Sequence, residues 1–311
     1  MSIDPIVNND PVGWHEKVND LLAAWDGGAA PTSFGAALVR LNAMADDLSL
    51  PTMESLDSTA VKRAKINGLI STYMSGDWMP VVLGSSIKAF WSADRTDLIT
   101  LSGTQVTSWK DVIAGYDMVQ AVSGARPVWS ADGFNGAPAV DYDGIDDQMT
   151  LTGVPLSFPI GSDPGEMWIV FDNEAAGADT TTRRVFNYGG TTNNNSRALT
   201  LAGVSGTQRL GGYVGNGASA GFSAVPPVDA SGRRAARLQI DGGVATAIDG
   251  SDLTTKAVTT PATTDTMVRS GLGVSGTGPF NGKIRHIMLT GILAGDDLAK
   301  VWAWTEIQRR A

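Results

Sequence analysis

Two different periods of apolar positions divide the chain into two parts. From about residue 11 to residue 76, apolar side chains recur at three- and four-residue intervals, a pattern typical of amphipathic helices. From residue 87 to about residue 290 they alternate with polar residues in short runs, separated by Gly, Asp and Ser. That alternation is typical of antiparallel strands with one buried face. The pattern predicts a small helical module followed by a large β-sheet part.

Three short helices are predicted in the first part, and so few residues can build only a thin apolar core. Two interpretations stay open: a bundle packed on the β part, or an attachment and oligomerisation module. Exposure of Trp14 and Trp25 on the first helix would favour the second interpretation. The predicted helix boundaries are Asp10-Pro11 and Gly27-Gly28, Thr32 or Ser33 and Pro51, and Asp57 or Ser58 and Gly76.

The second part is predicted to be mainly β, with dense turns that favour a sandwich over a parallel sheet. A closing helix is expected over residues 295–309, with Leu298, Val301, Trp302 and Ile307 facing the sandwich. Seven large side chains in the strand runs are expected in the core: Trp91, Trp109, Tyr142, Trp168, Phe171, Phe280 and Ile284.

Several segments share their order with a known fold family. FWSADRTDLITLSGTQVTSWKD, GARPVW and FNGAPAVDYDGIDDQMTL come first, and RLQIDGGVATAIDG, FNGKIRHIML and LAGDDLAKVWAWTEIQRR follow. This order resembles a concanavalin A-like lectin/glucanase domain, a laminin-G-like jelly roll, in the version found in bacteriophage and prophage structural proteins. The resemblance covers about residues 86–310 and implies an antiparallel sandwich over 87–311. Residues 1–80 would then be the helical module and residues 81–86 a linker.

Charge and composition narrow the classes of partner. The net charge is −9, so the surface repels phosphate backbones, and we expect neither nucleic-acid binding nor association with anionic membranes. The chain has no cysteine, which excludes disulfides and thiolate metal sites. We expect no signal peptide in MSIDPIVNNDP, and no apolar run is long enough for membrane insertion.

The sequence favours a protein that is not an enzyme. The glucanases of the resembled fold carry a carboxylate triplet on one strand face, and this sequence has none. Retaining hydrolysis needs two carboxylates about 5–5.5 Å apart. The nearest acidic set, Glu166, Asp172 and Glu174, flanks a strand, and we expect it to lie at solvated strand ends. His15 and His286 are distant in sequence, and a strand-face histidine is more often structural.

Two candidate binding sites remain. Asp143, Asp146 and Asp147 could supply oxygen ligands for calcium, the one cofactor considered, although a simple Asp-Gly turn is the favoured interpretation. Aromatic rings with nearby amides could hold a glycan in a shallow loop site, although each residue taken singly fits a covering of sheet edges better. The glycan candidates are Asn187, Tyr188, Asn193, Asn194, Asn195, Tyr213 and Asn216.

The resemblance implies a phage or phage-like virion fibre, spike or decoration protein, assembled in the bacterial cytoplasm and exposed on the particle. The expected partners are host cell-surface polysaccharide through the sandwich, and other virion proteins through residues 1–80. A homo-oligomer is also expected. The alternatives are a decoration protein that binds only virion subunits and a polysaccharide-degrading glycoside hydrolase. The helical module would attach the protein, and the sandwich would meet the host.

Overall fold

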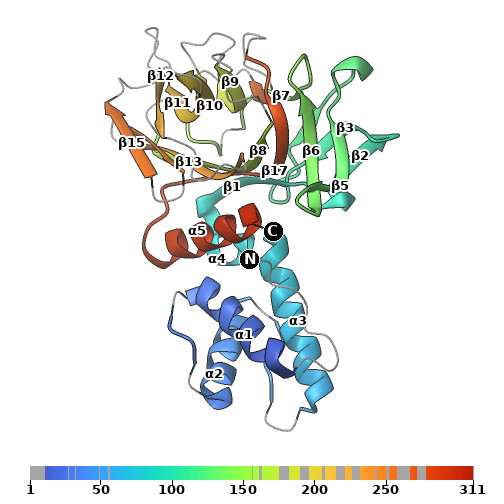
Figure 1. Ribbon diagram of the computed structural model, residues 1–311, viewed down its shortest axis with the longest axis vertical. Helices are drawn as coiled ribbons and strands as arrows, with labels where there is room; N and C mark the ends of the chain where they lie inside the picture. Colours follow the sequence, from blue (N-terminus) through green and yellow to red (C-terminus); the bar gives the residue numbers. More distant parts are fainter. Residues whose placement is uncertain are drawn as a thin grey trace. The chain divides into compact units, whose positions relative to one another are not determined.

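The computed structural model describes most of the chain as helices and antiparallel strands (Figure 1). The described residues are 11–26, 28–31, 33–48, 50–54, 57–155, 157–160, 163–174, 182–189, 196–204, 207–214, 221–225, 232–241, 244–249, 252–257, 267–271 and 278–310. They fall into two compact units. The helical unit contains residues 1–85 and 293–310, and the sandwich unit contains residues 86–292.

The elements follow the predicted order of helices, strands and a final helix. The helices are α1 Pro11–Asp26, α2 Phe34–Asp47, α3 Thr59–Ser75, α4 Met79–Leu83 and α5 Gly295–Arg310, with short 3-10 turns η1 Gly84–Ser86, η2 Thr96–Leu98 and η3 Ser123–Ala125. The strands are β1 Ile87–Ser92, β2 Ile99–Ser102, β3 Gln105–Lys110, β4 Asp117–Val119, β5 Val128–Phe134, β6 Ala137–Asp143, β7 Met149–Thr152, β8 Gly165–Asn173, β9 Arg183–Gly189, β10 Ser196–Val204, β11 Thr207–Val214, β12 Gly221–Val225, β13 Arg233–Asp241, β14 Val244–Asp249, β15 Asp252–Ala257, β16 Met267–Ser270 and β17 Asn281–Thr290. No described helix is long and apolar enough to cross a membrane.

Side-chain caps begin two of the helices, as the sequence predicted. The hydroxyl of Ser33 accepts a hydrogen bond from the Ala36 amide at the start of α2, and that of Ser58 accepts one from the Val61 amide at the start of α3. Each cap pairs an amide that has no partner inside the helix. Gly76 ends α3 in the left-handed conformation, with φ of 77°.

Three aromatic side chains pack together inside the helical unit. Trp25 is 4% exposed, and its ring meets those of Tyr73 and Trp78 edge-on at centroid distances of 6.3 and 5.6 Å. The Lys300 ammonium lies 4.0 Å from the centre of the Trp25 ring. Trp25 therefore does not provide the exposed ring that would favour an attachment and oligomerisation module, and the side chain of Trp14 lies outside the described residues.

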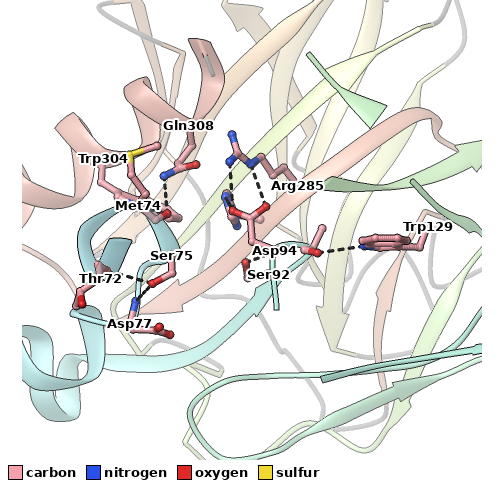
Figure 2. A network of polar contacts seen from close by, with 12 residues as sticks. Thr72, Met74, Ser75, Asp77, Ser92, Asp94, Trp129, Arg285, Trp304 and Gln308 are labelled. Carbon is pink, nitrogen blue, oxygen red and sulfur yellow. Dashed lines mark hydrogen bonds and ion pairs between the residues drawn. The ribbon is translucent and has the colours of Figure 1, made fainter. Parts of the chain in front are cut away.

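Helix α5 clusters with the helices, whereas the sequence analysis placed it in the sandwich domain. Trp304 Nε1 and Gln308 Nε2 both donate to the carbonyl oxygen of Met74, at 3.4 and 2.8 Å (Figure 2). The buried residues of α5 include Val301 and Trp304, whereas Trp302 is only partly buried. The apolar face of α5 is thus rotated from the predicted one.

The sandwich unit has two layers of antiparallel strands, a form visible in Figure 1. In the first layer the order is β15, β14, β13, β8 and β17, and the far edge of β17 pairs with β1 and β6. In the second layer the order is β7, β16, β9, β10, β11 and β12. Strands β5, β3 and β4 connect β6 to β7 at one side, with β2 paired to β3. Every described pairing is antiparallel, which confirms the predicted mainly β class.

The core lies between the two layers. All seven side chains predicted to be buried are at most 1% exposed, which confirms that prediction. Six of them belong to the inter-layer cluster, where Trp91 meets Phe186 and Tyr142 meets Phe280. The exception is Trp168, which alternates with the core residues Met167 and Ile169 and so faces the opposite side of β8.

Candidate functional site

A polar row crosses the outer face of the second layer. Phe186 and Tyr188 belong to the inter-layer core, so Asn187 between them faces outward. Asn187 lies opposite Arg269 on β16, and Arg269 lies opposite Thr150 on β7. In the other direction the register continues through Ala198 on β10 to position 213 on β11. The row therefore brings an amide, a guanidinium and a hydroxyl side by side on a rigid sheet.

The row runs from partly exposed to buried side chains. Thr150 and Arg269 are partly exposed, whereas Asn187 is fully buried. Burial lowers the pKa of the Arg269 guanidinium because loss of water penalises its charged form. Arg184, the next outward position on β9, lies opposite Thr200 and is 6% exposed. Thr150 and Arg269 can therefore offer hydrogen bonds and positive charge to a ligand at the exposed end of the row, while Asn187 and Arg184 lie buried behind them.

Tyr188 does not belong to this face. Its ring packs edge-on against Phe158 in the core, and its hydroxyl donates to the Pro159 carbonyl at 2.9 Å. Burial raises the pKa of that hydroxyl. Because Tyr188 is 3% exposed, it offers no ring on which a sugar can stack, and its proposed role as an aromatic platform is wrong.

Of the other glycan candidates, some lie in described strands and the rest lie in parts of the chain that the structure does not describe. Asn187 and Tyr213 lie in one cross-strand row, a proximity that the sequence did not predict. The structure does not describe the side chain of Tyr213. Four further candidates lie wholly outside the described residues: Asn193, Asn194, Asn195 and Asn216.

The three candidate calcium ligands do come together. One carboxylate oxygen each from Asp143, Asp146 and Asp147 lies within 4.8 Å of the others. The carboxylate of Asp147 accepts the Asp143 amide at 3.0 Å, and that of Asp143 accepts the Ile145 amide at 2.8 Å. Both bonds fit the turn interpretation, and three carboxylates would supply only part of the six to eight oxygens that calcium takes.

Burial and charge act together on Asp147. It is 7% exposed, and loss of solvation raises the pKa of its carboxyl to about 6, with the neighbouring carboxylates adding to that shift. The hydrogen bond from the Asp143 amide opposes the shift. A bound cation would act in the opposite direction, because it favours the ionised carboxylate.

The expectation of solvated strand ends is wrong for Glu166, whereas Asp172 is partly exposed and Glu174, just after β8, is exposed as expected. Glu166 is 3% exposed and forms an ion pair with Arg237. Its carboxylate also accepts the Trp168 indole N–H at 2.9 Å, and the Arg237 guanidinium lies 5.1 Å from the centre of the Trp168 ring. Glu166 is thus part of a buried ion pair in the first layer. Glu174 is ion-paired with Lys283.

His286 has the structural role expected of it. It is 1% exposed, and its Nε2 lies 3.7 Å from the Asp94 carboxylate. Arg285 donates to the same carboxylate at 3.2 Å (Figure 2). Burial raises the pKa of Asp94, and the Arg285 charge opposes that shift. The contacts of His286 and Arg285 with Asp94 connect β17 to the turn after β1. The side chain of His15, the other histidine, lies outside the described residues.

No protein-family model and no curated protein matches the chain. Known structures do resemble it. Domain 4 of AbnA, a GH43 extracellular arabinanase from Geobacillus stearothermophilus in complex with arabinotriose, is 14% identical with a TM-score of 0.48 over 70% of this chain and 98% of that domain. Trypanosoma rangeli sialidase is 9% identical, with a TM-score of 0.49 over 72% of this chain and 34% of the sialidase. An arabinofuranosidase complexed with arabinofuranosyl-α-1,2-xylobiose is 14% identical, with a TM-score of 0.48 over 66% of this chain and 51% of that protein.

These comparisons correct two predictions. A phage virion fibre, spike or decoration protein was expected, whereas the similar structures are an arabinanase, an arabinofuranosidase and a sialidase. The expectation that the chain is not an enzyme is withdrawn, because the similar structures come from glycoside hydrolases and a sialidase. Virion partners and an oligomer also have no support. The chain spans about half of the arabinofuranosidase and a third of the sialidase, and identities this low show the fold alone.

Sequence reasoning missed the arginines of the second layer. The signal was present in RRVFNYG, SRALTLAGV, TQRLGGYV and MVRS, which contain arginine but no acidic residue in a strongly acidic chain. Arg269 is placed beside Asn187 only by the pairing of β16 with β9, and Arg184 is placed on the same face only by the bulged pairing of β9 with β10.

Proposed function

We propose that the sandwich unit binds polysaccharide through the outer face of its second layer. The observation that carries this proposal is the row of Thr150, Arg269 and Asn187, three polar side chains of different hydrogen-bonding type in consecutive cross-strand positions. A saccharide presents hydroxyl groups that both donate and accept, and such a row supplies both functions.

The position of the row on strands matters for recognition. Side chains on a paired sheet are held more accurately than side chains on loops, so less conformational entropy is lost when a ligand binds. Tyr188, Phe186 and Val268 anchor the inner faces of the same strands in the core, which fixes the outward residues in place. We also propose the concanavalin A-like jelly-roll topology for this unit, supported by its two antiparallel layers.

The test is binding of the full chain to a panel of plant, bacterial and animal polysaccharides, measured by affinity electrophoresis and calorimetry. Thr150→Val removes one hydroxyl from the row at nearly constant volume. Loss of one hydrogen bond should weaken binding about two- to tenfold. The matched control is Thr246→Val on β14 of the first layer, which is also partly exposed and should leave affinity unchanged.

Both variants should keep the melting temperature of the parent chain, since neither removes core packing. Failure of every polysaccharide in the panel to bind would refute the proposal. Equal weakening by the two threonine substitutions would place the binding surface elsewhere on the molecule.

A further inference from the structure

The second layer has an unusual distribution of charge. Its six strands contain five arginines and no aspartate, glutamate or lysine. The seven strands of the first layer carry seven acidic and seven basic residues. The whole chain has 32 acidic residues against 23 basic ones. The strands of the second layer therefore carry a net positive charge, whereas those of the first layer are balanced and the whole chain is acidic. The five arginines are Arg183, Arg184, Arg197, Arg209 and Arg269.

The register separates these arginines by role. Arg183 and Arg197 hydrogen-bond the backbone carbonyls of Pro279 and Asp163, at 2.7 and 2.8 Å. The other three occupy positions on the outer face: Arg269 lies opposite Asn187, Arg184 opposite Thr200 and Arg209 opposite Ala202.

The three outward arginines fall in successive rows across the sheet. Outward positions along a strand repeat every two residues, about 7 Å. Arg269 and Arg209 are partly exposed and lie within reach of a ligand, whereas Arg184 is buried between their rows. The outer face therefore presents a cationic strip that runs obliquely over β16, β9 and β11.

We infer that the saccharide bound by this face is anionic and carries carboxylate groups, as uronate and sialate polymers do. The inference rests on the proposed function, and the layer's arginine content with its lack of acidic residues is what carries it. A guanidinium presents a planar fork of N–H donors that matches a carboxylate with two parallel hydrogen bonds. Lysine, which lacks this geometry, does not occur in these strands.

Partial burial strengthens such a contact. Attraction between unlike charges grows as water is excluded, so a carboxylate beside Arg269 gains more than it would at an open surface. Burial lowers the pKa of Arg269 because it penalises the charged guanidinium, and a neighbouring anion would favour that charged form. The net charge of −9 repels polyanions from the rest of the surface and so directs them to this strip.

The test compares polymers that differ only in charge. The probes are polygalacturonate, alginate, hyaluronate and polysialate, each beside its own methyl-esterified form, with arabinan as a neutral polymer. At least one acidic polymer should bind at least tenfold more tightly than its ester, and that binding should weaken as salt rises from 50 to 500 mM. Binding of arabinan and the esters without any preference for the acids would overturn the inference and leave the proposed function standing. Binding by none of the probes would overturn the inference as well.

Variants of the full chain locate the contact. Arg269→Gln and Arg209→Gln should each weaken binding of the acidic polymer at least fivefold more than they weaken binding of its ester. Arg269→Lys, which keeps the charge but loses the fork, should fall between Arg269→Gln and the parent. The matched control is Arg95→Gln, a surface arginine paired with Asp97 on η2, which should change nothing. Melting curves verify that each variant is folded.

Two results would contradict the inference that these arginines bind carboxylates. Equal loss in Arg95→Gln and Arg269→Gln would mean that total charge, and not this strip, governs binding. Binding of single-stranded DNA or of a sulfated polymer, with the affinity and arginine dependence of the uronate polymer, would define a general polyanion site in place of a carboxylate-specific one.

Discussion

Arg269 on β16 lies directly opposite Asn187 on β9, in a pairing that joins two strands far apart in the sequence. The neighbouring residues Val268 and Tyr188 face the core from the same two strands, so the two polar side chains share the outer face. This pairing connects the polar row to the cationic strip, because Arg269 belongs to both. The same two strands therefore contribute to the core on one face and to the candidate binding site on the other.

The two layers are joined by a hydroxyl pair whose loss should be measurable. Tyr142 on β6 and Ser270 on β16 are fully buried, with their hydroxyl oxygens 2.6 Å apart. Ser270→Ala should lower the free energy of unfolding by about 1–3 kcal/mol, because it leaves a buried tyrosine hydroxyl without this partner. Tyr142→Phe with Ser270→Ala should cost less than the sum of the single changes. Chemical denaturation of the four proteins measures the coupling, and strict additivity would contradict it.

The Glu166–Arg237 ion pair should be expensive to break. Glu166→Gln keeps the shape of the side chain but leaves the buried Arg237 charge uncompensated, which should cost on the order of 3–5 kcal/mol. The matched control is Glu174→Gln, because its ion pair with Lys283 is far more exposed and should be worth less than about 1 kcal/mol. Urea unfolding of both variants gives the comparison. Similar small losses would show that the buried pair is as weak as the surface one.

Gly271 should tolerate no side chain. Its φ is +79°, and an added Cβ would lie 2.2 Å from the Tyr142 ring and 2.7 Å from the Asp147 carbonyl oxygen. Gly271→Ala should therefore cost on the order of 3 kcal/mol or more, from steric overlap added to backbone strain. Gly153, with φ of +82° and open space around it, isolates the backbone term, so Gly153→Ala should cost about 1 kcal/mol. Equal melting temperatures for the two variants would contradict the predicted overlap.

Asp147 should make stability depend on pH. Its native pKa of about 6 exceeds the value of about 3.9 for an unfolded aspartate, so the native state binds protons more tightly. This contribution to stability is complete below about pH 4 and is lost as pH rises through about 6, at no more than about 1.4 kcal/mol per pH unit.

Asp147→Asn removes the titrating group, so the slope of unfolding free energy between pH 4 and 6 should become more positive than in the parent chain. Above pH 6 the variant should be the more stable of the two, because no buried charge forms. Exposed Asp132 provides the control, and Asp132→Asn should reproduce the parent curve. An unchanged slope in Asp147→Asn, from denaturation measured across this range, would show that Asp147 does not titrate as proposed.

Local pattern was sufficient for much of the fold. Alternation of apolar residues located the strands and the buried side chains Trp91, Trp109 and Phe280, because strand geometry sends every second residue to one face. The starts of two helices were recognisable to within one residue, at Thr32 or Ser33 and at Asp57 or Ser58, because a cap is decided by a few neighbouring residues. These features depend on neighbours along the chain, and the sequence by itself determined them.

Only the tertiary structure decided which strands pair and which residues meet. Periodicity places Asn187 on one face of β9 but contains nothing about β16, so the approach of Arg269 followed from long-range pairing. In the same way, Glu166 had the sequence signature of a solvated strand end, and its burial with Arg237 depends on β13 lying beside β8. Helix α5 clusters with helices from the other end of the chain. In each case the free energy that stabilises the arrangement comes from contacts between segments distant in sequence, which no local pattern of residues encodes.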